Sequence, residues 1–95
     1  MIIEFTARNF QAPTNLREYA ENEVQKIKKV FDRTTQCQII LIQEKNGFTT
    51  EINISIPNRK LNVKETTDNV TKSIDRAVAT MIQRVSKIKE KMYQY

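Results

Sequence analysis

The most distinctive chemistry in this chain belongs to the lysines and arginines near its C-terminal end. Residues 67–92 read as one amphipathic helix when laid out at 100° per residue. The apolar face of this predicted helix consists of Val70, Ile74, Ala77, Val78, Met81, Val85, Ile88 and Met92. The cations that fall on one flank of that face are Lys72, Arg76, Arg84, Lys87 and Lys91. A helix that needs only solubility would scatter both signs of charge, so the row of cations predicts a polyanionic partner, usually a nucleic acid. The alternative is a solvated basic face without a partner.

The inventory of catalytic and metal-binding residues is small. The chain has no histidine, one cysteine and one glycine, which leaves no basis for a transition-metal cluster or a glycine-rich phosphate loop. Cys37 lies within an apolar strand, where a buried and inert thiol is expected rather than a nucleophile. No pair of carboxylates is set apart for acid–base work. The sequence therefore predicts a protein that is not an enzyme and that uses no metal and no cofactor.

Composition bounds the rest of the interpretation. The 95 residues, 39% of them apolar, predict a single domain over residues 1–95 with a modest core. The net charge of +5 and the pI near 9.5 fit a partner that carries phosphates. A single cysteine suits a reducing compartment. Neither a secretory signal nor a membrane span is recognisable at the N-terminus, so a cytoplasmic location is expected.

Two types of hydrophobic period alternate along the chain. Residues 3–8 alternate apolar and polar side chains and predict a half-buried strand. Pro13 or Thr14 is expected to open a helix, as first-turn proline or as capping threonine, and Thr34 and Thr35 to end it. The apolar face of that helix comprises Leu16, Tyr19, Ala20, Val24, Ile27, Val30 and Phe31.

Three further strands are expected before the final helix. Residues 36–44 form the first, and Asn46-Gly47 then favours a two-residue type I′ hairpin turn, because both residue types tolerate positive φ. Residues 51–56 alternate cleanly, and Pro57-Asn58 turns the chain into another alternating strand at residues 60–64. Thr67 or Asp68 is expected to cap the final helix.

This pattern predicts an α+β fold of order β-α-β-β-β-α, with a four-stranded mixed sheet and two helices packed on one face. Short turns make the last three strands antiparallel, and the crossover through the first helix sets the first strand parallel to a neighbour. Ile40 and Ile42 would point to the open face of the sheet, as sheltered mid-sheet residues or as a contact patch.

Several short motifs occur in an order and spacing that resemble those of one known family. They are Leu16-Arg17-Glu18-Tyr19, Val30-Phe31-Asp32-Arg33, Gln43-Glu44-Lys45, Ile74-Asp75 and Arg84-Val85-Ser86-Lys87-Ile88-Lys89-Glu90-Lys91. In length, element order and motifs the whole chain resembles the short members of the ribosome hibernation-promoting factor family, also called ribosome-associated inhibitors or sigma-54 modulation proteins.

The resemblance implies a partner and a mechanism. Members of this family bind the small ribosomal subunit in the channel used by messenger RNA and transfer RNA, with a basic helical surface against ribosomal RNA, so that occupancy blocks translation. The RNA-binding residues that the resemblance implies here are Lys26, Lys28, Lys29, Arg33, Arg76, Arg84, Lys87, Lys89 and Lys91. Lys26 and Lys28 could instead form ordinary surface pairs with nearby glutamates.

The chain departs from the family pattern at two places. Thr80 and Gln83 stand where the family usually has basic residues, so affinity or orientation on the ribosome could differ. The sequence ends at Tyr95, without the C-terminal dimerisation domain of long members, and a monomer is expected when the protein is free.

Two other functions remain open at this stage. Residues 14–92 alone have the α-β-β-β-α order of a double-stranded RNA-binding domain, although the lysine cluster and the loop histidine of such domains are absent. An RRM fits less well, because the strands offer no aromatic platform. A cytoplasmic adaptor that binds proteins through the open sheet face is the alternative outside nucleic-acid binding.

Overall fold

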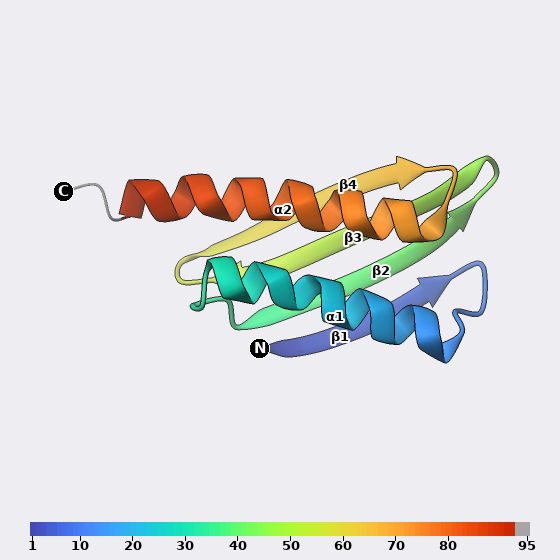
Figure 1. Cartoon of the computed structure of the whole chain (residues 1–95), viewed down its shortest axis with the longest axis horizontal. Coiled ribbons are helices and arrows are strands. Elements are labelled where there is room, and N and C mark those ends of the chain that lie inside the picture. The colour runs from blue at the N-terminus through green and yellow to red at the C-terminus, as the bar shows by residue number, and fades with distance from the viewer. Residues whose placement is uncertain (93–95) are drawn as a thin grey trace.

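The order of helices and strands is the one that the hydrophobic periods predict. The computed structural model describes residues 1–92. Its elements are β1 (Ile2–Arg8), α1 (Thr14–Val30), β2 (Gln36–Glu44), β3 (Gly47–Ile56), β4 (Arg59–Thr67) and α2 (Val70–Met92). The strands form one sheet in the order β1-β2-β3-β4, in which β1 runs parallel to β2 and the other neighbours are antiparallel. Both helices lie on the same face of this sheet (Figure 1), which confirms the predicted fold class.

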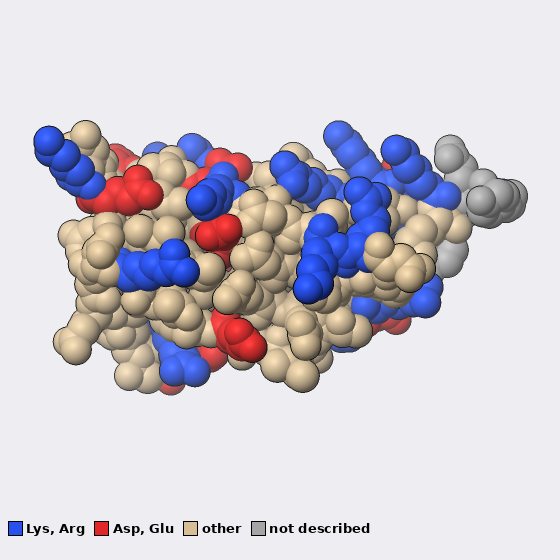
Figure 2. Space-filling model, turned by 180° about the vertical axis from the view of Figure 1, so that it is seen from behind, with Lys and Arg blue, Asp and Glu red and all other residues tan. Residues whose placement is uncertain are grey.

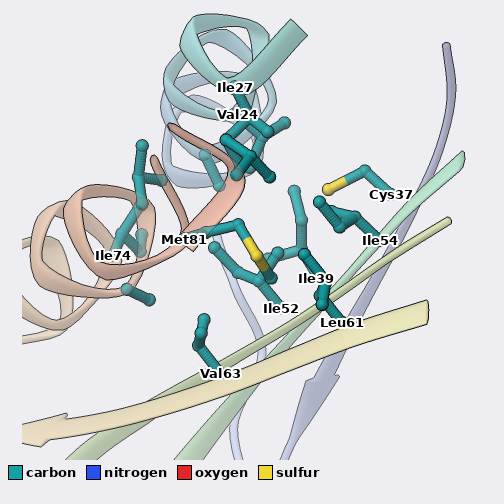
Figure 3. Packing of buried hydrophobic residues seen from close by; sticks show 14 of the residues in the cluster. Val24, Ile27, Cys37, Ile39, Ile52, Ile54, Leu61, Val63, Ile74 and Met81 are labelled. Atoms are coloured by element: carbon teal, nitrogen blue, oxygen red, sulfur yellow. The ribbon is translucent and has the colours of Figure 1, made fainter. Parts of the chain in front are cut away.

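The core lies between that face and the two helices. Alternation places Ile39 of β2 and Ile52 of β3 on the helix-facing side, where both are fully buried. Met81 extends from α2 towards these two side chains, and Val24 and Ile27 of α1 close the other side (Figure 3). Burial of each such side chain contributes about 1.5–3 kcal/mol, so the period-2 and period-3.6 patterns together define the core.

The opposite face of the sheet is open, and Ile40 and Ile42 lie on it. Ile40 is only 5% exposed, because it stands in mid-sheet between Thr6 of β1 and Glu51 of β3. Ile42 is half-buried beside Arg8. The first of the two expectations, that these residues are sheltered by their neighbours, is confirmed.

The expected type I′ turn at Asn46-Gly47 is wrong. Lys45 and Asn46 form the turn, Glu44 pairs with Gly47 across it, and none of the turn residues has positive φ. Gly47 is required for a different reason. A Cβ at this position would collide with the backbone carbonyl oxygen of Thr67, so the glycine allows β3 to approach the end of β4. In the second hairpin, Asn58 does adopt a left-handed conformation, with φ of 64°.

The helix boundaries also differ from the expected ones. Pro13 occupies the N-cap position of α1, and Thr14 is the first residue of the helix. Pro13 is therefore not a first-turn proline, and Thr14 is not the cap. The helix ends at Val30, before Thr34 and Thr35. The N–H of Phe31 donates to the carbonyl of Ile27 at 2.9 Å, and this side chain turns into the core.

Neither Thr67 nor Asp68 caps α2. The cap is Asn69, whose Oδ1 accepts the backbone N–H of Lys72 at 3.0 Å. The Thr67 hydroxyl bonds to the backbone of Asn69 instead, accepting its N–H at 3.2 Å. Because β4 extends through Thr67, the cap lies two residues after Thr67 and one after Asp68.

Candidate nucleic-acid interface

The outer flank of α2 presents exposed cations, as its helical spacing predicts. Arg76, Arg84, Lys87 and Lys91 are all exposed, while the opposite side of the helix is buried in the core. Arg84 Nη1 also donates to the carbonyl of Asn62 at 2.7 Å, which holds the guanidinium against the free edge of β4. The remaining N–H groups of a guanidinium can still bind a phosphate.

Thr80 lies between Arg76 and Arg84 along the helix, and its side chain forms a hydrogen bond within the protein. Its hydroxyl donates to Glu65 of β4 at 3.0 Å. A basic side chain at this position would stand beside that carboxylate, and part of its charge would be neutralised. The departure from the family pattern at Thr80 therefore removes less positive potential than the sequence alone indicates.

Two of the implied RNA-binding lysines donate to backbone carbonyl oxygens at or just after the end of α1. Lys28 Nζ donates to Thr34 O, in the segment that follows the helix, at 3.1 Å, and Lys89 Nζ reaches from α2 to Val30 O, the last residue of the helix, at 2.9 Å. Cations at this end of a helix satisfy its unpaired carbonyls and complement its dipole. Both lysines thus hold the structure together, in addition to any contact with a partner.

The remaining RNA-binding residues implied near the first helix are Lys26, Lys29 and Arg33, and each has a different environment. Lys26 Nζ pairs with Glu23 at 2.9 Å, which confirms the surface pair considered for it. Lys29 is exposed near the end of the helix. Arg33 was expected within the first helix, but it lies in the turn that follows α1, because the helix ends at Val30.

Tertiary packing gathers basic residues from three separate segments at one end of the molecule. The bond from Lys89 to Val30 joins the last turns of α2 to the end of α1, and the bond from Arg84 to Asn62 joins α2 to the beginning of β4. We call this region the basic end. It comprises Lys28, Lys29, Arg33, Arg59, Lys60, Arg84, Lys87, Lys89 and Lys91. Figure 2 shows Lys and Arg side chains crowded at this end, while most acidic side chains lie towards the middle and the other end.

Arg59 and Lys60 belong to the basic end but were not among the residues implied by the sequence. They begin β4 directly after the Pro57-Asn58 turn, and both are exposed. Because α2 packs on β4 and runs back towards the start of that strand, these cations come close to the last turns of α2 (Figure 1). Conversely, Arg76 of the implied set lies near the start of α2, away from the basic end, and Lys26, just before Lys28, is paired with Glu23.

A contact between side chains also joins the two helices. The hydroxyl of Tyr19 donates to Oδ1 of Asp75, and both residues belong to the motifs quoted above. The hydrogen bond to Asp75, assisted by burial, raises the pKa of Tyr19 to about 12. This contact fixes the helices relative to each other, so this part of the motif pattern is explained by packing.

The cysteine and the acidic side chains offer little chemistry in the folded chain. Cys37 is 1% exposed, and burial raises the pKa of its thiol to about 12, so the expected buried thiol is confirmed. Within residues 1–92, acidic and sulfur side chains do not come together in a group of three that could hold a metal ion. None of the helices in the same range has the length and apolarity that crossing a membrane requires.

Comparison with known proteins places the chain in a family. It is 22% identical over 95 residues to a ribosome hibernation promoting factor of Escherichia coli (strain K12), and the alignment covers all of both chains. A ribosomal subunit interface protein from Coxiella burnetii superposes with a TM-score of 0.87 at 24% identity, covering 94% of this chain and 98% of that one. The N-terminal domain of Thermus thermophilus Protein Y superposes with a TM-score of 0.84 at 22% identity, covering 93% and 99%. Residues 3–93 match the family described as Sigma 54 modulation protein / S30EA ribosomal protein, and the chain belongs to that family.

Proposed function

We propose that this protein is a ribosome-binding translation inhibitor, a hibernation factor that acts by occupancy. It occupies the messenger RNA and transfer RNA channel of the small ribosomal subunit and contacts ribosomal RNA through its basic surface. Its action is cytoplasmic, and it is a monomer when free. It catalyses no reaction and needs no cofactor or small-molecule substrate.

The observation that carries this proposal is the basic end. Cations from residues 28–33, 59–60 and 84–91 converge there, and within these three ranges the acidic residues are Asp32 and Glu90. Such a surface suits the closely spaced phosphates of folded RNA, since lysine and arginine bind the backbone without reading sequence. Family membership and the names of the relatives support a ribosomal partner.

Two measurements test the proposal. Tagged protein should co-sediment with small ribosomal subunits on sucrose gradients. In a purified translation system, inhibition should saturate near one protein per ribosome and should be relieved by excess initiator transfer RNA, because both ligands compete for one channel. Substoichiometric inactivation that persists after removal of the protein would instead identify an enzyme, and protein that stays at the top of the gradient would contradict ribosome binding.

A further inference from the structure

The open face of the sheet carries a hollow next to the basic end. Its volume is about 340 Å³, at the lower limit of sites that hold small organic groups. Most of the side chains that line it from this face are amides and a hydroxyl, namely those of Gln36, Gln38, Asn53, Ser55 and Asn62, and the carboxylate of Glu4 lies at its β1 side. We call it the amide hollow. Lys60, a member of the basic end, also lines it, so the two surfaces are continuous.

Three of these amides are joined in a hydrogen-bonded row across β2, β3 and β4. Asn62 Nδ2 donates to Asn53 Oδ1 at 2.5 Å, and Asn53 Nδ2 donates to Gln38 Oε1 at 3.1 Å. Asn62 Nδ2 also donates to Glu51 at 2.7 Å. The row fixes the orientation of each amide before any ligand arrives, which lowers the entropy lost on binding.

The row leaves hydrogen-bonding groups available to a ligand. A side-chain amide has two N–H donors and an oxygen with two lone pairs. Within residues 1–92, neither Gln38 Nε2 nor Asn62 Oδ1 has a hydrogen-bond partner. The amide hollow therefore presents an oriented donor and an oriented acceptor from neighbouring strands.

We propose that the amide hollow binds one unpaired nucleobase of the RNA whose phosphates lie on the basic end. This inference rests on the proposed function and specifies what part of the RNA the same surface recognises. Unpaired bases present donors and acceptors on their exposed edges, and amide side chains pair with such edges. Ile2, which is 64% exposed and also lines the hollow, supplies an apolar surface for the face of the base.

A protein partner fits the same face less well. Protein interfaces have an apolar centre enriched in aromatic residues. Of the large hydrophobic residues within positions 1–92, Ile2 and Met92 are the exposed ones, and Ile40 at the middle of this face is sheltered. The polar lining favours the edge of a base, and the phosphate attached to that base would lie on the side of Lys60, away from Glu4.

The test compares two oligoribonucleotides of about eight nucleotides, within the usual site size of single-strand binders, one with mixed bases and one abasic. Binding of each to the full chain is measured by fluorescence anisotropy at low salt. Gln38→Ala should weaken binding of the base-bearing strand by on the order of tenfold and leave the abasic strand unchanged. Gln43→Ala, at the other end of the same strand, removes the same side chain outside the hollow and should change neither.

A second variant guards against an indirect effect of losing the amide. Ser55→Leu fills the hollow without removing any amide, and it should reproduce the loss for the base-bearing strand, while thermal melts show that both variants fold. Equal binding of the wild-type protein to both oligonucleotides would overturn the inference and leave ribosome binding intact. Weaker ribosome binding by Gln38→Ala with unchanged oligonucleotide binding would also overturn it, since it would assign the face to a protein or to paired RNA. Failure to co-sediment with ribosomes would overturn the proposed function itself.

Discussion

Replacing Lys87 and Lys91 together with glutamine should reduce the salt dependence of ribosome binding while the fold survives. Both side chains are exposed in the last turns of α2, and neither forms a salt bridge within residues 1–92. Glutamine has nearly the same helix propensity as lysine, so the helix should persist. The variant therefore removes charge and little else.

The size of the effect follows from counterion release. Each lysine that neutralises one phosphate contributes roughly 0.7–0.9 to the log–log slope of affinity against salt, so the double variant should lower the slope by about 1.4–1.8. Between about 50 and 200 mM salt, two such contacts account for roughly a tenfold change in affinity. Arg59 and Lys60, replaced together, should produce a similar change, because the packing of α2 on β4 brings them to the same end.

The assay is co-sedimentation or anisotropy with purified small subunits over a series of salt concentrations. The matched control is the pair Lys45→Gln and Lys72→Gln, which removes the same charge from the opposite end of the molecule. The control should leave the slope nearly unchanged. If the control and the Lys87/Lys91 variant lower the slope equally, only net charge matters, and the basic end has no specific role.

Three further predictions concern stability. Ile54→Asp should destabilise the domain by about 4 kcal/mol or more, because it places an unpaired charge at a core position that is 2% exposed; chemical denaturation measures this. Gly47→Ala should cost about 1–3 kcal/mol in the same assay, because the added Cβ meets the carbonyl of Thr67. Tyr19→Phe should cost about 0.5–1.5 kcal/mol near neutral pH by removing the hydrogen bond to Asp75. Because the folded state raises the pKa of Tyr19 from 10.0 to about 12, the stability difference between wild type and this variant is full below pH 10 and is lost as the pH rises to about 12.

Each of these predictions has an internal control. Asn53→Asp, on the open face beside Ile54, should still fold, and equal loss in both variants would show that the faces of β3 are misassigned. Asn46→Ala should change stability by less than about 0.5 kcal/mol, whereas a larger loss would support a turn that needs positive φ. Burial also raises the pKa of Cys37, so this residue makes stability depend on pH in the alkaline range as well. Cys37 is present in both the wild type and Tyr19→Phe, so its contribution cancels in the difference between them.

The sequence by itself determined the elements and their faces. Alternation in residues 51–56 and the helical period in residues 70–92 are local geometric properties, and a hydrophobic side chain at such a spacing reaches the core whatever the detailed packing. The order of these elements and their short turns then leaves few topologies, which is why the mixed sheet and the single helical layer are predicted correctly. Turns and caps are less predictable, since competing residues differ by about 1 kcal/mol or less and tertiary contacts choose among them. Gly47 is needed because the end of β4 approaches it closely, and not because the turn needs positive φ. Asn69 is the cap of α2 because β4 continues through Thr67.

Only the tertiary structure decided which cations act together. A helical wheel groups residues of one helix, but it cannot show that the last turns of α2 pack beside the start of β4 and the end of α1. That packing adds Arg59 and Lys60 to the basic end and leaves Arg76 away from it, and Lys89 donates to a carbonyl of α1. Net charge and the face of a single helix can be read from the sequence. The electrostatic potential that a phosphate meets depends on the distances between charges in three dimensions, which the sequence does not give.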